Sequence, residues 1–330
     1  MQGAGLAVLG AGALGTALAD CLARAGADVV LWGRDGAQLN AMARARENAR
    51  YMPGVRLCEA LRLTASLGEA APGRVLIAAA PAQAARDLLT QVAALRLAPT
   101  PVITVAKGIE QTSGLFMCDV IAQCLPGFPA AILSGPSFAQ DLARGLPTAM
   151  TLACRDLRHA RRLAQTLTTP TLRLYHSSDT RGVEIGGAAK NVLAIACGVS
   201  AGRGLGASAG AALLARAFAE LGRFGAAYGA RPRTLMGLSG LGDLALTCAS
   251  PQSRNYALGL ALGRGEQLSD IVARGKLAEG AATAGALVAL ARGKGVEMPI
   301  CEAVDKVLNA GGNVGAVIEA LLARPQRAEI

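Results

Sequence analysis

A short apolar stretch that runs directly into a glycine-rich turn constrains the fold of this chain more than any other feature. The apolar stretch covers residues 6–9, and the turn reads Gly10-Ala11-Gly12-Ala13-Leu14-Gly15. A helical pattern follows over residues 16–25 and ends at Gly26, and residues 29–32 form a second apolar stretch. A strand, a glycine turn, a helix and a second strand in this order are typical of a dinucleotide-binding unit.

The three glycines of the turn have distinct physical roles in such a unit. Gly10 permits the tight turn, Gly12 lets backbone N–H groups approach a pyrophosphate, and Gly15 lets the helix pack closely on the strand. The pyrophosphate then lies at the positive end of the helix dipole. A glycine-rich turn that binds no ligand is the alternative, but the flanking strands and helix favour a bound cofactor.

Alternating strand and helix patterns continue through the first half of the chain. We expect a helix over residues 82–95 and further strands over residues 75–80, 102–105, 131–133, 149–153 and 172–175. This alternation predicts an α/β fold with a mostly parallel, doubly wound sheet of the Rossmann type.

From about residue 179 the strand patterns stop and Ala/Leu-rich helical patterns begin. We therefore predict an NAD(P)-binding Rossmann-like domain over residues 1–182 and an all-α substrate-binding domain over residues 183–330. Within the second domain we expect helices over residues 186–196 and 208–222, joined by a flexible connector over residues 198–206.

The composition argues against several classes of function. The net charge of +10 accompanies only 3% aromatic residues, and Arg161-Arg162 is the only adjacent pair of arginines. Binding of single-stranded nucleic acid needs basic residues interleaved with aromatic ones, so we expect the charge to serve an anionic small molecule and no nucleic acid.

Cysteines and histidines give the expected compartment. Eight cysteines without a C-x-x-C pair, and only two histidines, predict no metal site and a reducing, cytoplasmic environment. The N-terminus lacks the early basic residues of a signal peptide, and prolines interrupt the uncharged stretch near residues 120–140. We therefore expect no membrane insertion.

The end of the second apolar stretch bears on the choice of cofactor. It reads Trp32-Gly33-Arg34-Asp35. An arginine at this place accommodates the 2′-phosphate of NADP, and an acidic residue binds the ribose of NAD. We therefore predict use of NADP or NAD, with NADPH slightly favoured through Arg34. A solvated surface arginine is the alternative.

Lysine is scarce, because only five of the 33 basic residues are lysines. Lys190 lies beside Asn191 in a stretch of small and apolar residues, and lysine can lose its proton there when it is desolvated, whereas arginine cannot. We predict that Lys190 is a general acid/base. Asp243, if buried, needs a partner such as Lys190, with Thr247 on the same helical face. Capping of a helix is the alternative for Asp243.

A polar turn later in the chain has the composition of a phosphate site. Ser253-Arg254-Asn255 opens a helical pattern, and a serine, an arginine and free N–H groups at a helix start bind phosphate well. Ordinary capping by Ser253 is the alternative.

In this order, the segments resemble the bacterial NAD(P)-dependent glycerol-3-phosphate dehydrogenase family of the soluble, cytosolic type along essentially the whole chain. The resemblance is carried by residues 10–19, 51–54, 106–110, 133–139, 146–148, 183–191, 237–248, 253–255 and 278–280. It implies reversible reduction of dihydroxyacetone phosphate to sn-glycerol 3-phosphate, which supplies glycerophospholipid synthesis. The apolar Ala/Leu helices make a homodimer the expected assembly.

The resemblance also implies roles for matching residues. Lys190 would exchange a proton with the C2 oxygen of the substrate, assisted by Lys107 and Asp243. The substrate would contact Lys107, Lys190, Asp243, Thr247, Ser253, Arg254 and Asn255. Besides the turn glycines, the dinucleotide would contact Ala13, Leu14, Arg34, Lys107, Gly135, Ser137, Ala139, Arg254, Leu277 and Glu279. For Lys107, a solvated loop lysine is the alternative.

Three positions depart from the family pattern. Leu14 replaces a residue that is often aromatic, Ser208 replaces a usual Asn, and Gly210 replaces a usual basic residue. Two rival functions are left open by the residues themselves. One is a two-domain reductase with a lysine acid that acts on a 2-keto or 3-hydroxy carboxylate, and the other is a non-catalytic dinucleotide sensor.

Overall fold

The first half of the chain folds around one eight-stranded sheet. The computed structural model describes residues 5–274 and 278–325. Within them the strands pair in the order β3-β2-β1-β4-β5-β6-β7-β8, all in parallel except for the antiparallel pair of β6 with β7. Their bounds are β1 (Leu6–Leu9), β2 (Val29–Trp32), β3 (Arg62–Thr64), β4 (Val75–Ala78), β5 (Val102–Thr104), β6 (Ala130–Ser134), β7 (Thr148–Cys154) and β8 (Leu172–Ser177).

Helices cover both faces of this sheet, as a doubly wound fold requires. Alternate residues of β1 divide between two hydrophobic clusters: Leu6 and Val8 belong to one, and Ala7 and Leu9 to the other. The first cluster includes side chains of α1 (Ala13–Arg24), α2 (Gly36–Ala45), α6 (Ala139–Ala143) and α7 (Leu157–Leu167). The second includes α3 (Leu67–Ala70), α4 (Ala82–Ala94) and α5 (Met117–Cys124). The predicted Rossmann-like sheet is confirmed; β3 has three residues, too few for a sequence pattern to reveal.

The strand order creates a crevice at the carboxyl end of the sheet. The chain builds outward from β1 to β2 and β3, and then resumes at β4 on the other side of β1. At such a reversal the connections leave β1 and β4 in opposite directions, and ligands bind in the gap between them. The glycine turn follows β1, and Lys107 follows β5 at the same edge.

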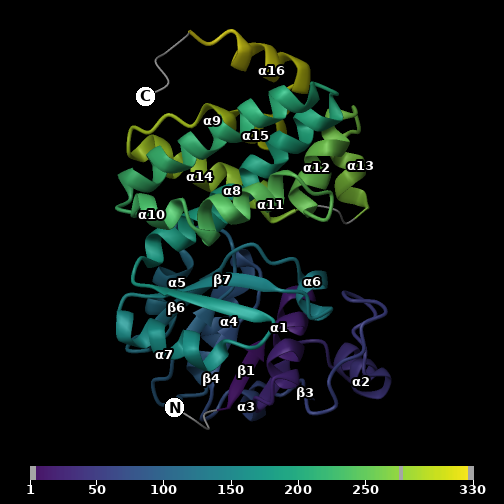
Figure 1. Cartoon of the computed structure of the whole chain (residues 1–330), viewed down its shortest axis with the longest axis vertical. Coiled ribbons are helices and arrows are strands. Elements are labelled where there is room, and N and C mark those ends of the chain that lie inside the picture. Colours follow the sequence, from purple (N-terminus) through teal and green to yellow (C-terminus); the bar gives the residue numbers. More distant parts are fainter. Residues whose placement is uncertain (1–4, 275–277, 326–330) are drawn as a thin grey trace.

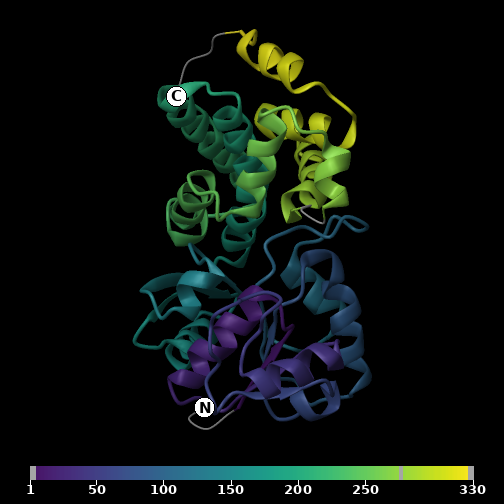
Figure 2. The same ribbon diagram turned by 90° about the vertical axis from the view of Figure 1, so that its right-hand side faces the viewer.

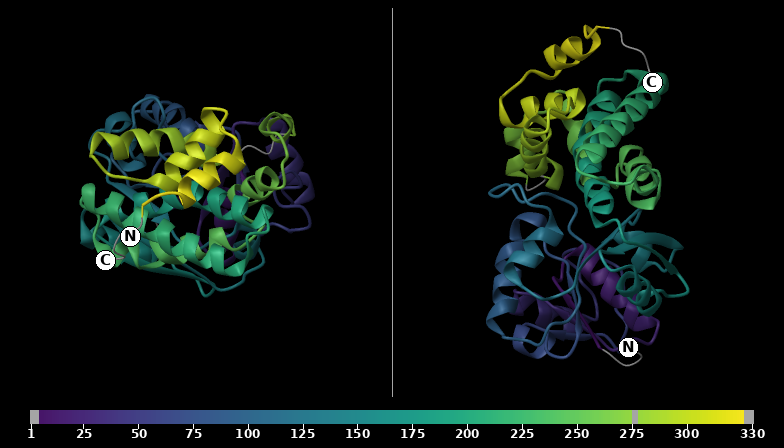
Figure 3. Two further views of the ribbon diagram at one scale, coloured as in Figure 1. Left: turned by 90° about the horizontal axis from the view of Figure 1, so that it is seen from above. Right: turned by 90° about the vertical axis from the view of Figure 1, so that its left-hand side faces the viewer.

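The second half of the chain is helical, as predicted, and forms the upper lobe in Figures 1 and 2. Its elements are α8 (Thr180–Gly202), α9 (Gly206–Ala227), α10 (Pro232–Leu235), a π-helical turn η1 (Leu238–Gly242), α11 (Asp243–Cys248), α12 (Arg254–Gly263), α13 (Leu268–Ala273), α14 (Glu279–Gly293), α15 (Pro299–Asn309) and α16 (Val314–Leu322). In the side views of Figures 2 and 3, α16 lies at the end of the molecule farthest from the sheet.

Helix α8 is the core of this lobe. By length and composition alone it could cross a membrane, but 78% of its most apolar window is buried inside the protein. It packs against α9, α11, α12, α14 and α15, so its side chains are enclosed by other helices rather than left for lipid. Its apolar character is therefore that of a core helix.

Four glycines bring α8 and α12 into backbone contact. Gly198 and Gly202 on α8 face Gly259 and Gly263 on α12, and we call these four residues the glycine seam. A Cβ atom at Gly198 would lie 2.1 Å from a carbonyl oxygen of α12, and one at Gly259 would lie 2.0 Å from a carbonyl oxygen of α8. The expected connector over residues 198–206 is therefore wrong: α8 continues to Gly202, because its glycines serve helix packing rather than flexibility.

Candidate active site

Two lysine ammonium groups share one buried carboxylate at the boundary of the two lobes. The Lys190 Nζ donates to Asp243 Oδ1 at 2.6 Å, and the Lys107 Nζ donates to Asp243 Oδ2 at 2.7 Å. Lys190 also donates to the Thr247 hydroxyl at 2.8 Å, and Lys107 donates to the Gly135 carbonyl at 2.9 Å. The expected pairing of Lys190 with Asp243 and Thr247 is present.

Three elements place these side chains. Lys190 lies in the middle of α8, Lys107 follows β5, and Asp243 is the first residue of α11. Gly242, rather than Asp243, is the N-cap of α11, so the capping alternative for Asp243 is not adopted. A Cβ atom at Gly186 would lie 2.3 Å from the carbonyl oxygen of Ser239, so this glycine allows the turn before Asp243 to approach α8.

Burial changes the acidity of both partners. Desolvation lowers the pKa of Lys190 from 10.5 to about 8, with Asp243 opposing the change and Lys107 adding to it. Burial acts to raise the pKa of Asp243, but the positive charges of Lys107 and Lys190 outweigh it and the net pKa is lowered. The result is an ionised aspartate beside a lysine that can both lose and regain a proton near neutral pH.

A chain of amide hydrogen bonds connects the helical lobe to the loop that carries Lys107. Asn191 donates to the Lys107 carbonyl at 2.9 Å and accepts from Asn255 at 2.9 Å. Asn255 in turn accepts from the Gly280 N–H at 2.9 Å, which joins α12 to the start of α14. The sequence drew attention to Asn191 beside Lys190 but gave it no role; the structure shows that Asn191 holds the backbone of Lys107.

Residues at the start of α12 fit an anion. Ser253 is the N-cap and accepts from the Tyr256 N–H at 3.2 Å, as the capping alternative proposed. Arg254 is exposed and forms no ion pair with any described residue, so its guanidinium can bind a ligand. The Asn255 amide has a second hydrogen that its contact with Asn191 does not use.

One further polar group near Lys107 escaped the sequence analysis. The Ser134 hydroxyl at the end of β6 is buried and has no hydrogen-bond partner among the described residues. A Cβ atom at Gly187 would lie 2.9 Å from this hydroxyl and 3.4 Å from Lys107 Cγ, so Ser134, Lys107 and α8 meet at one place. A serine in an apolar strand gives no sequence signal of such a position.

The glycine turn has the geometry of a pyrophosphate site. Gly10 has φ +135°, and a Cβ atom there would lie 2.7 Å from the Ala79 carbonyl oxygen after β4. A Cβ atom at Gly15 would lie 2.0 Å from the Gly10 carbonyl oxygen, so Gly15 allows α1 to pack on the turn. A Cβ atom at Gly12 would meet nothing within 4 Å, and no side chain caps the first N–H groups of α1. These free N–H groups fit a dinucleotide phosphate.

The remaining predicted cofactor residues lie around the same edge of the sheet. Ala13 and Leu14 open α1, Ala139 opens α6, and Ser137 donates to the Gly135 carbonyl at 3.1 Å. Glu279 at the start of α14 accepts from the Ala82 N–H at 3.3 Å. Leu277 lies outside the described residues.

The predicted specificity residues are at the end of β2. Arg34 is exposed, which leaves it available to solvent or to a ligand. Asp35 caps α2 by accepting from the Gln38 N–H at 3.1 Å, so part of its hydrogen-bonding capacity is already used.

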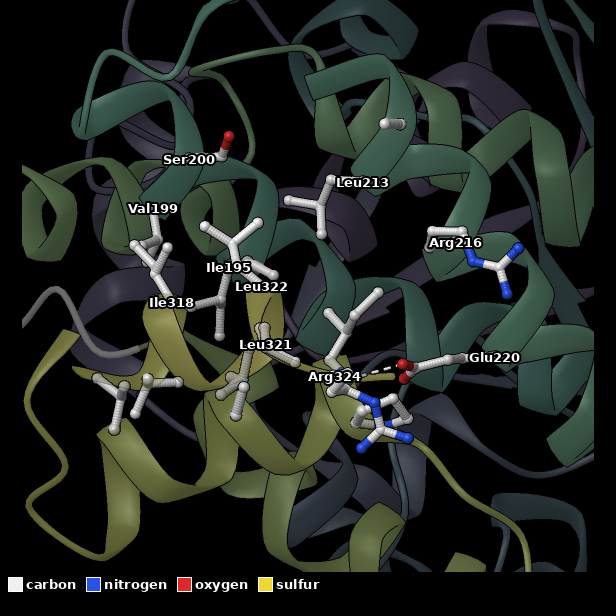
Figure 4. Close-up of a pocket in the computed structure, with 18 of the residues that line it drawn as sticks. Ile195, Val199, Ser200, Leu213, Arg216, Glu220, Ile318, Leu321, Leu322 and Arg324 are labelled. Carbon is white, nitrogen blue, oxygen red and sulfur yellow. Dashed lines mark hydrogen bonds between the residues drawn. The ribbon is translucent and has the colours of Figure 1, made fainter. Parts of the chain in front are cut away.

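A large apolar cavity is separate from these residues. It has a volume of about 1140 Å³ and lies between α8, α9, α15 and α16 (Figure 4). Aliphatic side chains such as Ile195, Leu213, Ile318 and Leu321 line it, and Arg216, Arg223 and Arg324 contribute its cations. None of the predicted site residues belongs to its lining, so its role is not in the chemistry at Lys190.

Comparisons with known proteins agree with this geometry. Residues 5–160 and 179–319 match the family models described as NAD-dependent glycerol-3-phosphate dehydrogenase N-terminus and C-terminus. A glycerol-3-phosphate dehydrogenase [NAD(P)+] of Azorhizobium caulinodans is 60% identical over 324 residues, which is 98% of each chain.

Solved structures give the same result. A glycerol-3-phosphate dehydrogenase structure from Coxiella burnetii is 36% identical with a TM-score of 0.92, covering 97% of this chain and 98% of the other. A ketopantoate reductase from Ralstonia eutropha covers 96% of this chain and 99% of the other, but is 17% identical with a TM-score of 0.61, so it shares the fold alone. The chain therefore belongs to the NAD-dependent glycerol-3-phosphate dehydrogenase family.

Proposed function

We propose that this protein catalyses the reversible reduction of dihydroxyacetone phosphate to sn-glycerol 3-phosphate with NADPH or NADH. The observation that carries the proposal is the pair of lysines on one buried carboxylate, at the edge of the sheet where the glycine turn lies. The relatives at 60% and 55% identity are named for the same activity, with either cofactor.

The chemistry assigned to each residue follows from its contacts. NAD(P)H, bound at the glycine turn, supplies the hydride that reduces the ketone carbon. The Lys190 ammonium gives its proton to the C2 oxygen, and in the reverse direction the neutral Lys190 amine takes that proton. Asp243 holds Lys190 in place, and Thr247 offers a second hydrogen-bond partner when the proton has left. Lys107 stabilises negative charge on the same oxygen and helps to keep the pKa of Lys190 low.

The start of α12 is the proposed phosphate site. Arg254 provides a charge-assisted contact, and Ser253 and Asn255 flank it at the positive end of the α12 dipole. Because Asn191 links Asn255 to the Lys107 backbone, binding of the phosphate is coupled mechanically to the position of an active-site lysine.

Initial rates with dihydroxyacetone phosphate and each reduced cofactor test the proposal directly. We expect turnover with both cofactors and a higher kcat/KM with NADPH. Ketopantoate is the control substrate: preferential turnover of ketopantoate would support a carboxylate reductase. Binding of NADPH without oxidation in either assay would support a sensor.

Cofactor preference is assigned to Arg34. We expect Arg34→Ala to raise KM for NADPH while KM for NADH changes little, because only NADPH carries the 2′-phosphate. An equal change in both KM values would mean that Arg34 does not contact that phosphate.

The setting of the reaction follows from the same proposal. The free thiols fit a cytoplasmic enzyme, and the product is the backbone of glycerophospholipids. We also propose a homodimer through the apolar surface of α9 and α16 beside the cavity of Figure 4, where Leu322 is 80% exposed. Light scattering should give twice the chain mass, and Leu213→Glu should reduce it to one chain mass; a monomeric unmodified protein would contradict this assembly.

A further inference from the structure

Two cysteines lie on the same helices as Lys190 and its hydrogen-bond partner Thr247. Cys197 is on α8, two helical turns after Lys190, and Cys248 ends α11 directly after Thr247. The two helices pack on each other, and the two thiols lie close enough for an interaction between them to shift the pKa of each. All eight cysteines lie in the described part of the chain and are free thiols.

A second cavity gives small molecules access to this pair. It has a volume of about 510 Å³, and both Cys197 and Cys248 belong to its lining. The rest of the wall includes small residues such as Gly206, Ala207 and Gly210, and a Cβ atom at Gly210 would meet nothing within 4 Å. Because Gly210 has no side chain, this part of the cavity that the two thiols line stays open.

The two thiols differ in acidity in a way that suits stepwise oxidation. The interaction with Cys248 lowers the pKa of Cys197, which favours the thiolate at that sulfur. The same interaction, together with burial, raises the pKa of Cys248. Cys118 and Cys301, by contrast, are buried thiols whose pKa is raised well above the usual range by desolvation, so they are poor nucleophiles.

We propose that Cys197 and Cys248 form a peroxide-reactive dithiol whose oxidation to a disulfide slows the enzyme. The Cys197 thiol loses its proton, the thiolate attacks one oxygen of hydrogen peroxide, and the O–O bond breaks; the departing hydroxide takes up that proton, so the products are a sulfenic acid and one water. Cys248 then attacks that sulfur, loses its proton and displaces a second water. In total, two thiols and one hydrogen peroxide give one disulfide and two waters: the dithiol loses two electrons and the peroxide gains them.

The disulfide changes the active site through Thr247. A disulfide holds its sulfur atoms about 2.05 Å apart, which is much shorter than any contact between two thiols, so the end of α11 must move toward α8. Thr247 is the neighbour of Cys248 and holds the Lys190 Nζ at 2.8 Å. Displacements of about 1 Å at such a group cost on the order of 10²-fold in rate. We expect a fall in kcat of about 10- to 100-fold, reversed when dithiothreitol reduces the bond.

The experiment treats the full-length enzyme with hydrogen peroxide and measures two quantities. Peptide mapping without reduction identifies the disulfide, and the rate with dihydroxyacetone phosphate and NADPH reports its effect. Cys197→Ala and Cys248→Ala should keep the untreated rate and resist the peroxide, with Cys197→Ser and Cys248→Ser as alternatives if either folds poorly. The matched control is Cys58→Ser/Cys124→Ser, which removes the two partly exposed cysteines and should remain sensitive.

The two readouts separate this inference from the proposed function, on which only the rate measurement rests. Linked peptides containing residues 197 and 248, with a loss of rate that dithiothreitol reverses, support the dithiol. Peroxide that leaves both thiols free, or that inactivates Cys197→Ala as fully as the unmodified enzyme, overturns it. A chain that forms the disulfide but never turns over dihydroxyacetone phosphate supports the dithiol and overturns the proposed function.

Discussion

The forward and reverse reactions should respond to pH in opposite directions, because the proposed mechanism makes both depend on the protonation of Lys190. With a pKa of about 8, Lys190 at pH 7 is about ten parts ammonium to one part amine. A lysine with the ordinary pKa of 10.5 would hold about 300-fold less neutral amine at that pH. In the proposed mechanism, burial therefore supplies most of the neutral amine that glycerol 3-phosphate oxidation needs.

The magnitudes follow from this titration. Reduction of dihydroxyacetone phosphate needs the ammonium, so its kcat/KM should be level below about pH 8 and fall about tenfold per pH unit above it. Oxidation of glycerol 3-phosphate needs the neutral amine, so its kcat/KM should rise about tenfold per unit up to about pH 8 and then level off. Replacement of Lys190 by arginine keeps the positive charge but removes the exchangeable proton, and should lower both rates by about 10²–10⁴-fold.

Initial rates in both directions between about pH 6 and pH 10, with and without Lys190→Arg, provide the test. Cofactor absorbance gives the rate, and saturating cofactor isolates the dependence on the substrate. Profiles that bend in the same direction for both reactions would refute the assignment. So would a Lys190→Arg enzyme that keeps the bend near pH 8, because the titrating group would then be a different residue.

Three further outcomes are expected. Asp243→Asn removes the carboxylate that raises the pKa of Lys190, so the bend in both pH profiles should move below pH 8 and kcat should fall by at least about 10²-fold; an unmoved bend would contradict the shared-carboxylate geometry. Gly259→Ala places a Cβ atom 2.0 Å from an α8 carbonyl oxygen and should lower the free energy of unfolding in urea by about 1–3 kcal/mol. The control is Gly222→Ala on α9, where a Cβ atom meets nothing within 4 Å; it should change the free energy of unfolding little or raise it. Similar losses in both variants would argue against the glycine seam. Burial raises the pKa of Glu184 from 4.5 to about 7. The stability that the protonated Glu184 contributes is therefore present below about pH 4.5 and is lost as the pH rises through 7. In the same assay, the free energy of unfolding of Glu184→Gln should gain about 3 kcal/mol relative to that of the unmodified protein between pH 5 and pH 8. Parallel pH profiles of the two proteins would contradict the raised pKa of Glu184.

Much of the first half could be predicted from the sequence because its signals are local. Most strands carry short apolar runs, and β8 carries an alternating pattern. The geometry of the glycine turn also follows from its residues: Gly10 takes a positive φ, and Gly15 packs against the Gly10 carbonyl. The pairing of Lys190 with Asp243 could also be predicted, since a charge placed among small apolar residues needs a partner of opposite sign.

The connections between distant segments could not be predicted in the same way. The hydrogen bonds that link Asn255, Asn191 and the Lys107 carbonyl form only after three separate elements have packed together. No periodic sequence pattern predicts such a role for an asparagine. The interpretation of residues 198–206 as a flexible connector was wrong for a related reason. A glycine lowers the stability of an isolated helix by about 1 kcal/mol. Only the contact with the opposing glycines of α12 shows that Gly198 and Gly202 serve helix packing.

The glycine seam also bears on how this enzyme can change over evolutionary time. The seam joins the helix that carries Lys190 to the helix that begins at Arg254, after its N-cap Ser253. At the seam the two backbones are in direct contact, so no side chain lies between them that could change its conformation to make room for a larger residue. A larger residue at any of the four positions must push α8 and α12 apart, and so move Lys190 away from the proposed phosphate site. Random mutagenesis should therefore recover few larger residues at these four positions, and a change in the distance between Lys190 and the start of α12 requires both helices to change together.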